Sequence, residues 1–303
     1  MHTLPYRHLA ALLSPVTLLT PTLCLAGLAF VLPAGAQQTG TQEVSAQQAG
    51  PPPALVESPD AGAIRANPAD ELEYAWVPAG TFQMGCVPAD TECDEDEMPR
   101  HAVTLSAGFW MGRTEVPVAA YEKFAAASGL PMPEAPEFNA GWRRKTHPIV
   151  RVSWSEAQAY CSWAGGNLPT EAQYEYAARG GQVGQRFPWG NDAGRERANF
   201  EGVEGFDRWE NTAPSGEFPA NDYGLHDLAG NVYEWTADWY HGSYYAHSPA
   251  TDPRGPEGGA ERVLRGGSWF TVPRVLRASD RFKYVPVAQD NSLGFRCTLS
   301  ELP

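Results

Sequence analysis

The chain beyond residue 185 shows almost no periodic pattern of apolar residues. Glycine, proline, asparagine and tryptophan dominate it, and only short strand-like pieces such as "RVLRGGSW" and "LGFRCTL" interrupt it. Ordering so much irregular backbone costs conformational entropy. We therefore expect internal supports in this half of the chain, and disulfides, buried tryptophans and metal ions are the available kinds. This expectation directs attention to the cysteines and to the acidic loops.

The first half of the chain carries clearer local signals. "EYAWVPAGTFQMG" alternates apolar and small residues, which predicts a strand pair with a turn at residues 78–80. "VPVAAYEKFAAASG" has helical spacing and a glycine stop at Gly129. Two more helices are predicted in "SWSEAQAYCSWAGG" and "LPTEAQYEYAARGG", where Ser153 and Thr170 are the N-caps and glycine pairs end the segments.

The N-terminal segment predicts an export signal over residues 1–36. A weakly positive start is followed by an uncharged apolar run that ends in Ala34-Gly35-Ala36, a pattern typical of signal cleavage. The alternative is a retained membrane anchor, although three prolines interrupt the run. We expect a periplasmic or secreted protein with no membrane insertion after cleavage. Residues 37–70, rich in Gln, Pro and Ala, predict a disordered linker, and residues 71–303 a single domain.

The charge of the chain restricts its partners. The formal net charge is −14, and removing residues 1–36, with one Arg and no acid, changes it by one to −15. So acidic a chain is a poor match for nucleic acid or anionic lipid, but it suits calcium.

Export permits disulfides. Without Cys24, which falls in the signal segment, four cysteines remain, enough for two bridges in any of three connectivities. Cys86 and Cys93 enclose a short loop that favours a local bridge, and Cys161 and Cys297 would then tie the middle of the chain to its end. The alternative is four buried thiols.

Two acidic loops offer oxygen ligands for calcium, a cation that takes six to eight oxygens. In residues 224–240, Asp227 and Glu234 flank a Gly-Asn turn that can aim carbonyls inward. In residues 198–224, Asn199 and Asp207 offer a weaker signal. The alternative in both loops is a solvated turn whose acids cap neighbouring amides.

Seven ordered blocks resemble the formylglycine-generating enzyme family, also called sulfatase-modifying factors. They are "VPAGTFQMG", "GFWMGRTEV", "HPIVRVSWSEAQAYCSWAGGNLPTEAQYEYAARGG", "PWG", "TAPSGEFPANDYGLHDLAGNVYEW", "RVLRGGSW" and "GFRC". The resemblance covers essentially all of residues 71–303. It implies an α+β, loop-rich variant of the C-type-lectin-like fold, with little regular secondary structure and with a bridge between Cys161 and Cys297.

The resemblance also implies two structural calcium sites in the acidic loops already described. The implied ligands of the first site are Asn199, the Phe200 carbonyl, Asp207 and the Trp209 carbonyl. Those of the second are Asp227, the Gly230 and Val232 carbonyls, and Glu234.

Members that make formylglycine use two cysteines just after the Gly-Gly-Ser stretch, where they hold copper(I) and bond to the substrate thiol. Here the first position falls on Thr271, and the second falls in "VPRVLR", which has no cysteine. A hydroxyl neither holds copper(I) nor exchanges with a disulfide. We therefore expect no bound copper and no conversion of cysteine to formylglycine by that mechanism.

Other relatives suggest other functions. Sulfoxide synthases place iron on three histidines, but the five histidines after residue 36 show no tight ligand spacing. Only His241 and His247 are close enough in sequence to meet, and surface histidines are the simpler interpretation. A periplasmic relative matures a siderophore chromophore without the cysteine pair, and further relatives are surface proteins that bind ligands through their C-terminal segment.

The segment "LRGGSWFTVP" and the residues after it offer close backbone approach, flat apolar side chains and guanidinium groups, but no general base. Aromatic residues with arginine are typical of recognition sites. The candidate ligand-binding residues are Ser268, Trp269, Phe270, Thr271, Arg274, Arg277, Arg281 and Tyr284. The alternative is that Trp269 is a core residue and the arginines pair with acids.

Three functional hypotheses remain at this point. The first is a domain whose former active groove binds a peptide, a protein or a small molecule. The second is a diverged oxidoreductase that acts on a peptide or a siderophore-type substrate with catalytic residues unknown. The third is a plain structural accessory domain.

Overall fold

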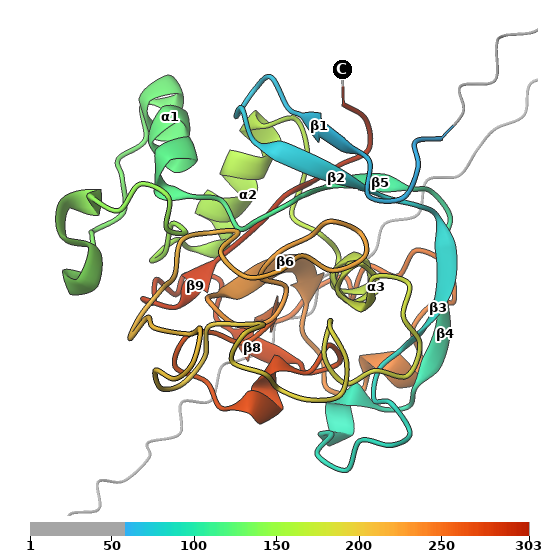
Figure 1. The fold of residues 1–303 in the computed structure, drawn as a ribbon. Coiled ribbons are helices and arrows are strands. Elements are labelled where there is room, and N and C mark those ends of the chain that lie inside the picture. The colour runs from blue at the N-terminus through green and yellow to red at the C-terminus, as the bar shows by residue number, and fades with distance from the viewer. Residues whose placement is uncertain (1–57, 303) are drawn as a thin grey trace, which may run out of the picture. The chain divides into compact units, whose positions relative to one another are not determined.

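The computed structural model describes residues 58–302, which contain three sheets and three α-helices joined by long loops (Figure 1). This mixed α+β, loop-rich architecture is the one that the family resemblance implied. The predicted signal and the N-terminal part of the predicted linker lie outside the described residues. No helix within 58–302 is long and apolar enough to cross a bilayer.

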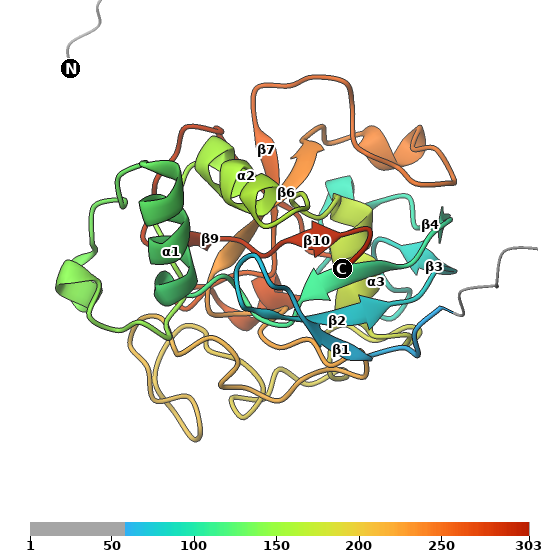
Figure 2. The ribbon, with the colours of Figure 1, turned by 90° about the horizontal axis from the view of Figure 1, so that it is seen from above.

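The first sheet contains both the first and the last strand of the described chain, at its two edges (Figure 2). Its order is β1 (Ile64–Ala66), β2 (Glu73–Val77), β5 (Phe109–Gly112) and β10 (Thr298–Leu299), with every neighbouring pair antiparallel.

The predicted linker boundary at residue 70 is wrong, because residues 58–70 belong to the domain. The buried Asn67 donates from Nδ2 to the carbonyl of Ala164 at 2.9 Å, and the buried Asp70 accepts a hydrogen bond from the Tyr74 hydroxyl at 2.8 Å. Composition predicted disorder for this stretch, but the long-range Asn67–Ala164 hydrogen bond and the pairing of β1 with β2 hold it in place.

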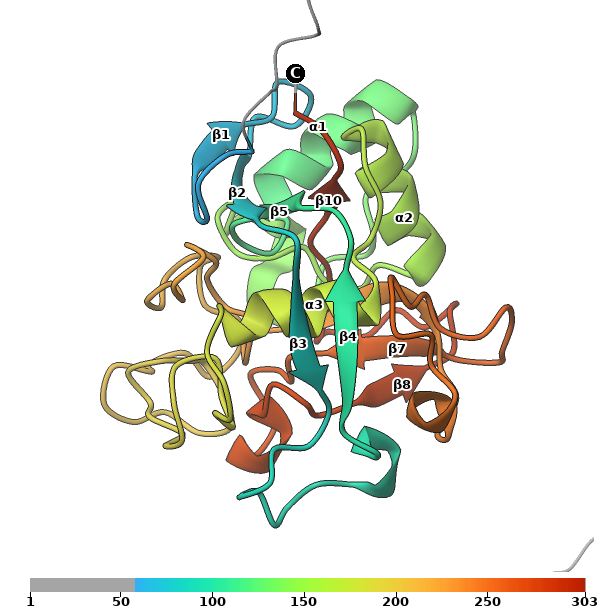
Figure 3. The ribbon, with the colours of Figure 1, turned by 90° about the vertical axis from the view of Figure 1, so that its right-hand side faces the viewer.

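The predicted strand pair over residues 73–84 also needs correction. Both strands form, but β3 (Gly80–Met84) pairs with β4 (His101–Leu105) in a separate two-stranded sheet. Residues 78–80 carry the chain from one sheet to the other. Helix α3 lies behind this β3–β4 sheet (Figure 3).

The helices follow their local signals closely. They are α1 (Val118–Ser128), α2 (Trp154–Trp163) and α3 (Glu171–Arg179), and short 3-10 turns lie at Glu95–Glu97, Glu137–Trp142, Tyr244–Ala246 and Pro273–Leu276. Ser153 and Thr170 cap α2 and α3 in reciprocal capping boxes. Gly129 and Gly180 end α1 and α3 in the left-handed conformation, as predicted.

The third sheet lies in the C-terminal half and has the order β8 (Phe282–Tyr284), β7 (Arg262–Arg265), β6 (Tyr233–Trp239) and β9 (Leu293–Gly294). The β6–β9 pair is parallel and the other two pairs are antiparallel. These strands are short, which agrees with the weak periodicity beyond residue 185.

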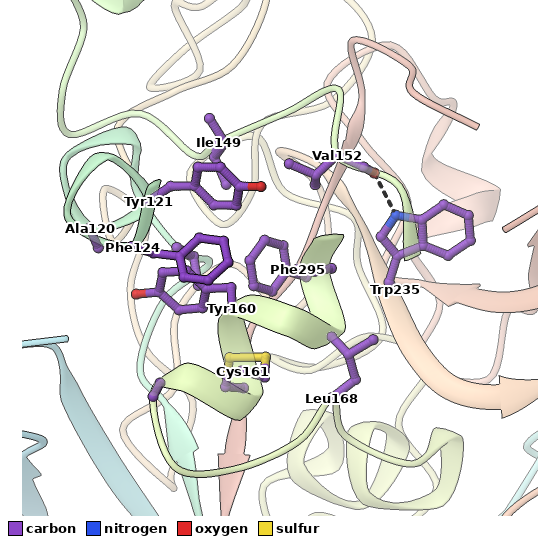
Figure 4. Close-up of a cluster of buried hydrophobic side chains, with 14 of the residues drawn as sticks. Ala120, Tyr121, Phe124, Ile149, Val152, Tyr160, Cys161, Leu168, Trp235 and Phe295 are labelled. Atoms are coloured by element: carbon purple, nitrogen blue, oxygen red, sulfur yellow. Dashed lines mark hydrogen bonds between the residues drawn. A yellow bond between two sulfur atoms is a disulfide. The ribbon is translucent and has the colours of Figure 1, made fainter. Parts of the chain in front are cut away.

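An aromatic cluster joins the two halves of the domain (Figure 4). The rings of Tyr121, Phe124, Tyr160 and Phe295 contact one another, with centroids 5.3 to 6.4 Å apart. The Cys161–Cys297 disulfide lies in this cluster, and a second disulfide joins Cys86 to Cys93. Both predicted bridges are confirmed.

Buried arginine–carboxylate pairs also hold the irregular part of the chain beyond residue 185, a kind of support that the sequence did not lead us to expect there. The four pairs are Arg265–Glu175, Arg277–Glu97, Arg281–Glu171 and Arg296–Glu234, with closest nitrogen–oxygen distances of 2.6 or 2.7 Å. The first three connect the C-terminal half to the first half. Because an unpaired buried charge is costly, each pair holds its two segments in one arrangement.

Candidate functional site

The Gly-Gly-Ser-Trp segment begins where β7 ends, and its turn requires glycine. Gly266 and Gly267 have φ values of +91° and +71°. A Cβ atom on Gly266 would lie 2.6 Å from the Tyr174 hydroxyl, and one on Gly267 would lie 2.8 Å from a methyl carbon of Leu276. The two glycines therefore allow the backbone to turn against packed neighbours.

Thr271 occupies the position of the first expected cysteine, and its hydroxyl is held inside a local turn. The side chain is buried, its Oγ1 donates to the carbonyl of Ser268 at 2.9 Å, and the same atom accepts from the Ser268 amide at 3.0 Å. Ser268 is fully buried as well. Thr271 therefore stabilises the turn, and neither Ser268 nor Thr271 offers an accessible ligand contact.

Trp269 is partly exposed and lines an open cavity of about 470 Å³. Its ring lies edge-to-face with Phe138 at 6.0 Å and with Phe270 at 5.3 Å between centroids. Arg151 and the amides of Asn211 and Asn291 also line the cavity. Trp269 therefore lines the cavity and is not a core residue, which agrees with its selection as a candidate ligand-binding residue.

Two of the three candidate arginines cannot contact a ligand, which corrects the predicted site. The Arg277 side chain is fully buried between Asp90, Glu97 and Asp280, and the Arg281 side chain is paired with Glu171. Acidic side chains hold both, as the alternative interpretation of these arginines expected, and most of the partners lie far away in sequence.

The remaining candidates are at least partly accessible to solvent but are not brought together in one place. Arg274 is half-buried and pairs with Asp94 at 2.5 Å. Phe270 is 49% exposed beside Trp269. Tyr284 lies on the edge strand β8 near Phe282 and is not among the residues that line the Trp269 cavity. The predicted set therefore reduces to Trp269, with Phe270 next to it, and Phe138 is the neighbour that the sequence analysis missed.

The first predicted calcium loop has an unsatisfied oxygen where a cation is expected. Asn199 is fully buried, and its Nδ2 donates to the Asn211 carbonyl at 2.7 Å, which fixes the amide orientation. Within residues 58–302, the Asn199 Oδ1 has no hydrogen-bond partner. Asp207 is buried nearby and accepts from the amides of Phe200 and Trp209. A buried acceptor without a donor is costly, so this donor set fits a bound cation.

The second predicted calcium loop contains more negative charge than the sequence analysis expected. The buried Asp227 Oδ2 accepts from the Gly216 amide at 2.5 Å, while its Oδ1 lacks a hydrogen-bond partner in the described chain. Glu115, just before α1, is fully buried with both carboxylate oxygens unpartnered there. Burial raises the pKa of Asp227 to about 6, and burial together with Asp227 raises the pKa of Glu115 well above its usual value.

Glu234, the other predicted carboxylate of this loop, already has strong partners. Arg296 contacts both of its oxygens at 2.7 Å, and the Tyr174 hydroxyl donates to Oε1 at 3.0 Å. One arginine thus faces three buried acids, Glu115, Asp227 and Glu234. Asp227 and Glu115 therefore fit a cation better than Glu234 does. A lone glutamate inside the apolar "GRTEVPV" run was the only sequence signal for Glu115.

The two predicted calcium loops are hydrogen-bonded to the Gly-Gly-Ser-Trp segment. The Gly230 amide donates to the Gly266 carbonyl at 2.8 Å, and the Trp269 amide donates to the Asn231 carbonyl at 2.9 Å. The Asn231 amide in turn donates to the Asn199 carbonyl at 2.8 Å. Any cation held in these loops would therefore fix the backbone that carries Trp269.

Histidine does not form a metal centre among the described residues. His147 is buried against Thr212, and burial lowers its pKa to about 4. His241 and His247 flank the 3-10 turn at Tyr244–Ala246. The group of possible metal ligands in the described chain consists of acids, Asp94, Glu97 and Asp280, whose oxygens lie within 4.8 Å of one another, and it includes neither histidine. Arginines occupy that group, with Arg277 contacting Glu97 and Asp280 and Arg274 contacting Asp94.

Comparisons with known proteins match almost all of the described chain. The model of a family described as the sulfatase-modifying factor enzyme 1-like domain matches residues 60–300. Formylglycine-generating enzyme from Mus musculus is 35% identical over 283 residues, which cover 75% of each chain. Its namesake from Thermomonospora curvata is 36% identical over 282 residues, 75% of this chain and 93% of that protein. The structure of PvdO from Pseudomonas aeruginosa superposes with a TM-score of 0.72 at 28% identity and covers 80% of this chain and 99% of that one.

Proposed function

This chain belongs to the sulfatase-modifying factor family, and from that membership we propose that it is an exported, calcium-stabilised binding domain without formylglycine-generating activity. Its ligand is a peptide segment that docks at the cavity beside Trp269, on the site of the former active groove.

The state of the cysteines supports the loss of the oxidase. All four cysteines among the described residues are in disulfides, so this part of the chain offers no thiolate for copper(I). Thr271 replaces the first expected cysteine, and both its donor and its acceptor functions are used within the turn. The site therefore has neither the metal ligand nor the disulfide-forming atom that the chemistry needs.

The wall of the cavity supports binding. Trp269 and Phe138 provide apolar faces, Arg151 provides a cation that pairs with Glu134 at 3.1 Å, and two asparagine amides provide donors and acceptors. This combination suits an extended peptide, which presents amide groups and side chains together. The observation that carries the proposal is that the turn buries Thr271 but leaves Trp269 in the wall of an open cavity.

Calcium is the second part of the proposal. Asn199 and Asp207 would hold one ion, and Asp227 with Glu115 would hold the other, together with carbonyls of the same loops. The ions would neutralise the buried acids and would bind the buried oxygens that have no hydrogen-bond partner in the described chain. They would thereby hold the loops that keep the Asn231–Trp269 hydrogen bond in place. Export agrees with the two disulfides, which form in oxidising compartments.

The groove is tested with peptides selected from a random displayed library on the calcium-loaded protein. We expect W269A to weaken the selected peptides by about 2 kcal/mol, because aromatic anchors dominate such sites. F282A is the control, since Phe282 is an exposed aromatic residue that does not line this cavity. Fluorescence anisotropy measures both variants. Failure to enrich any peptide, or equal affinity of W269A and the parent, would rule out this groove.

A further inference from the structure

A second cavity, of about 320 Å³, is lined by residues of β3 and of the end of α3. Figure 3 shows α3 behind β3 and β4. Its lining residues come from β3, from the end of α3 and the glycine-rich turn that follows, and from the separate positions of Arg100 and Tyr223. None of these residues lines the Trp269 cavity. The volume is at the lower end of the range for ligand pockets, enough for one aromatic ring and a short substituent.

Three aromatic rings form one side of this cavity. Phe82 and Tyr176 have ring centroids 5.2 Å apart, and Tyr176 and Tyr223 have centroids 6.1 Å apart. A Cβ atom on Gly80 would lie only 2.3 Å from the Tyr176 hydroxyl, so the glycine in β3 makes room for that ring. The wall is therefore aromatic, with neighbouring rings tilted by 50° and 52°, and it is fixed in place by packing.

Arg100 provides an uncommitted positive charge in the same cavity. Within residues 58–302 it forms no ion pair or side-chain hydrogen bond, and its Nε is buried without a partner. The neighbouring Arg179 is fully engaged by Glu175 and by the carbonyls of Gly85 and Gln185. Burial and Arg179 both lower the pKa of Arg100.

Glu175, the acid whose charge acts on Arg100, is already paired with two other arginines. Its oxygens contact Arg179 Nη2 at 2.7 Å and Arg265 Nη2 at 2.6 Å, so this carboxylate does not neutralise Arg100. A partly desolvated guanidinium without a counter-ion favours an anion, and its planar fork matches a carboxylate. This positive site is unusual in a chain of net charge −14.

We propose that this cavity binds a small aromatic carboxylate, with the carboxylate on the Arg100 guanidinium and the ring against Phe82, Tyr176 and Tyr223. A free aromatic acid and a polypeptide that ends in a C-terminal aromatic residue share this chemistry. The site is independent of the Trp269 groove, so either proposal can fail while the other stands.

Isothermal titration of the full chain with phenylacetate, with its uncharged amide and with the peptide Gly-Gly-Phe tests the proposal. We expect saturable binding of at least one of the two carboxylates, and binding of phenylacetamide at least about tenfold weaker than that of phenylacetate. The tighter of the two carboxylates identifies the source of the ligand. The proposal is overturned if neither carboxylate binds below about 10 mM, or if the amide binds as well as the acid.

Two variants locate the binding. R100Q should weaken the bound carboxylate at least about tenfold, whereas R254Q, which removes an exposed arginine from a different cavity, should change it less than about twofold. Circular dichroism melting checks that R100Q stays folded, which we expect because Arg100 has no internal partner to lose. Equal losses in both variants would show non-specific charge attraction and would contradict the proposal.

Discussion

At the scale of single residues, burial changes what a side chain can do. The arginines that follow the Gly-Gly-Ser-Trp segment suggested a recognition surface, but Arg277 and Arg281 are enclosed by acids from the other half of the chain. Thr271 is likewise committed to its own turn. Asp238 in β6 shows a third effect. Its Oδ2 accepts from the Glu171 amide at 2.8 Å, and burial together with the Glu171 charge raises its pKa to about 8.

The raised pKa of Asp238 predicts a pH dependence of stability. The folded chain holds a proton on this carboxyl that the unfolded chain loses near pH 4, so stability falls as pH rises from about 4 towards 8 and levels off above. Urea unfolding measures the free energy of unfolding at about pH 6 and at about pH 9. Between these two values the parent should lose roughly 1–3 kcal/mol more than D238N, whose side-chain amide keeps the hydrogen-bond acceptor but does not titrate. Identical pH profiles for the two proteins would contradict the assignment.

At the scale of elements, α3 connects the two halves through its acids. Glu171 and Glu175 lie on this helix, are buried, and hold Arg281 and Arg265 respectively. Glu175 also accepts from the Gly85 amide at 2.8 Å, which ties the helix to the end of β3.

E175Q should therefore lower the free energy of unfolding by about 3–5 kcal/mol, because it leaves the buried Arg265 and Arg179 without their carboxylate. E122Q is the matched control. It breaks an ion pair with Lys145 that is exposed to solvent and should cost less than about 1 kcal/mol. Urea denaturation compares the two, and similar losses would show that the buried pair contributes little.

Elements with local signals were predictable from the sequence, and elements that depend on distant partners were not. The caps of α2 and α3 lie within four residues of the groups they bind, so Ser153 and Thr170 were found. Strand β2 pairs with β1 and with β5, which is more than thirty residues away, whereas a nearby turn suggested a pairing with β3. Residue 115 was missed because its role depends on Asp227, which only the fold brings near.

At the scale of the whole molecule, buried ion pairs support a chain with little regular structure, and the two proposed calcium sites would add to that support. The long-range Cys161–Cys297 bridge, which spans 136 residues, adds a covalent support. The sequence predicted this bridge, but it did not predict that buried arginine–carboxylate pairs would hold so much of the irregular chain. The Arg296–Glu234 pair holds β6, and the loop around Asn231 is hydrogen-bonded to the segment that carries Trp269.

Removal of calcium should distinguish the roles of Asp227 and Glu234, the two predicted carboxylate ligands of the second loop. EDTA should lower the melting temperature of the parent, since a bound ion stabilises only the folded chain. D227N should lose most of this calcium-dependent increase. E234Q should be less stable with and without calcium, because it breaks the Arg296 pair. A melting temperature of the parent that does not respond to calcium would contradict both sites.

The loss of thiol chemistry is tested most directly by looking for the aldehyde product. The purified protein, supplied with calcium, copper(I), a reductant and air, is incubated with a cysteine-containing peptide of the sulfatase type, and mass spectrometry measures conversion of the thiol to an aldehyde. The Thermomonospora curvata enzyme is the positive control. We predict no aldehyde above the level without protein, and aldehyde formed at a rate that scales with protein concentration would contradict the account.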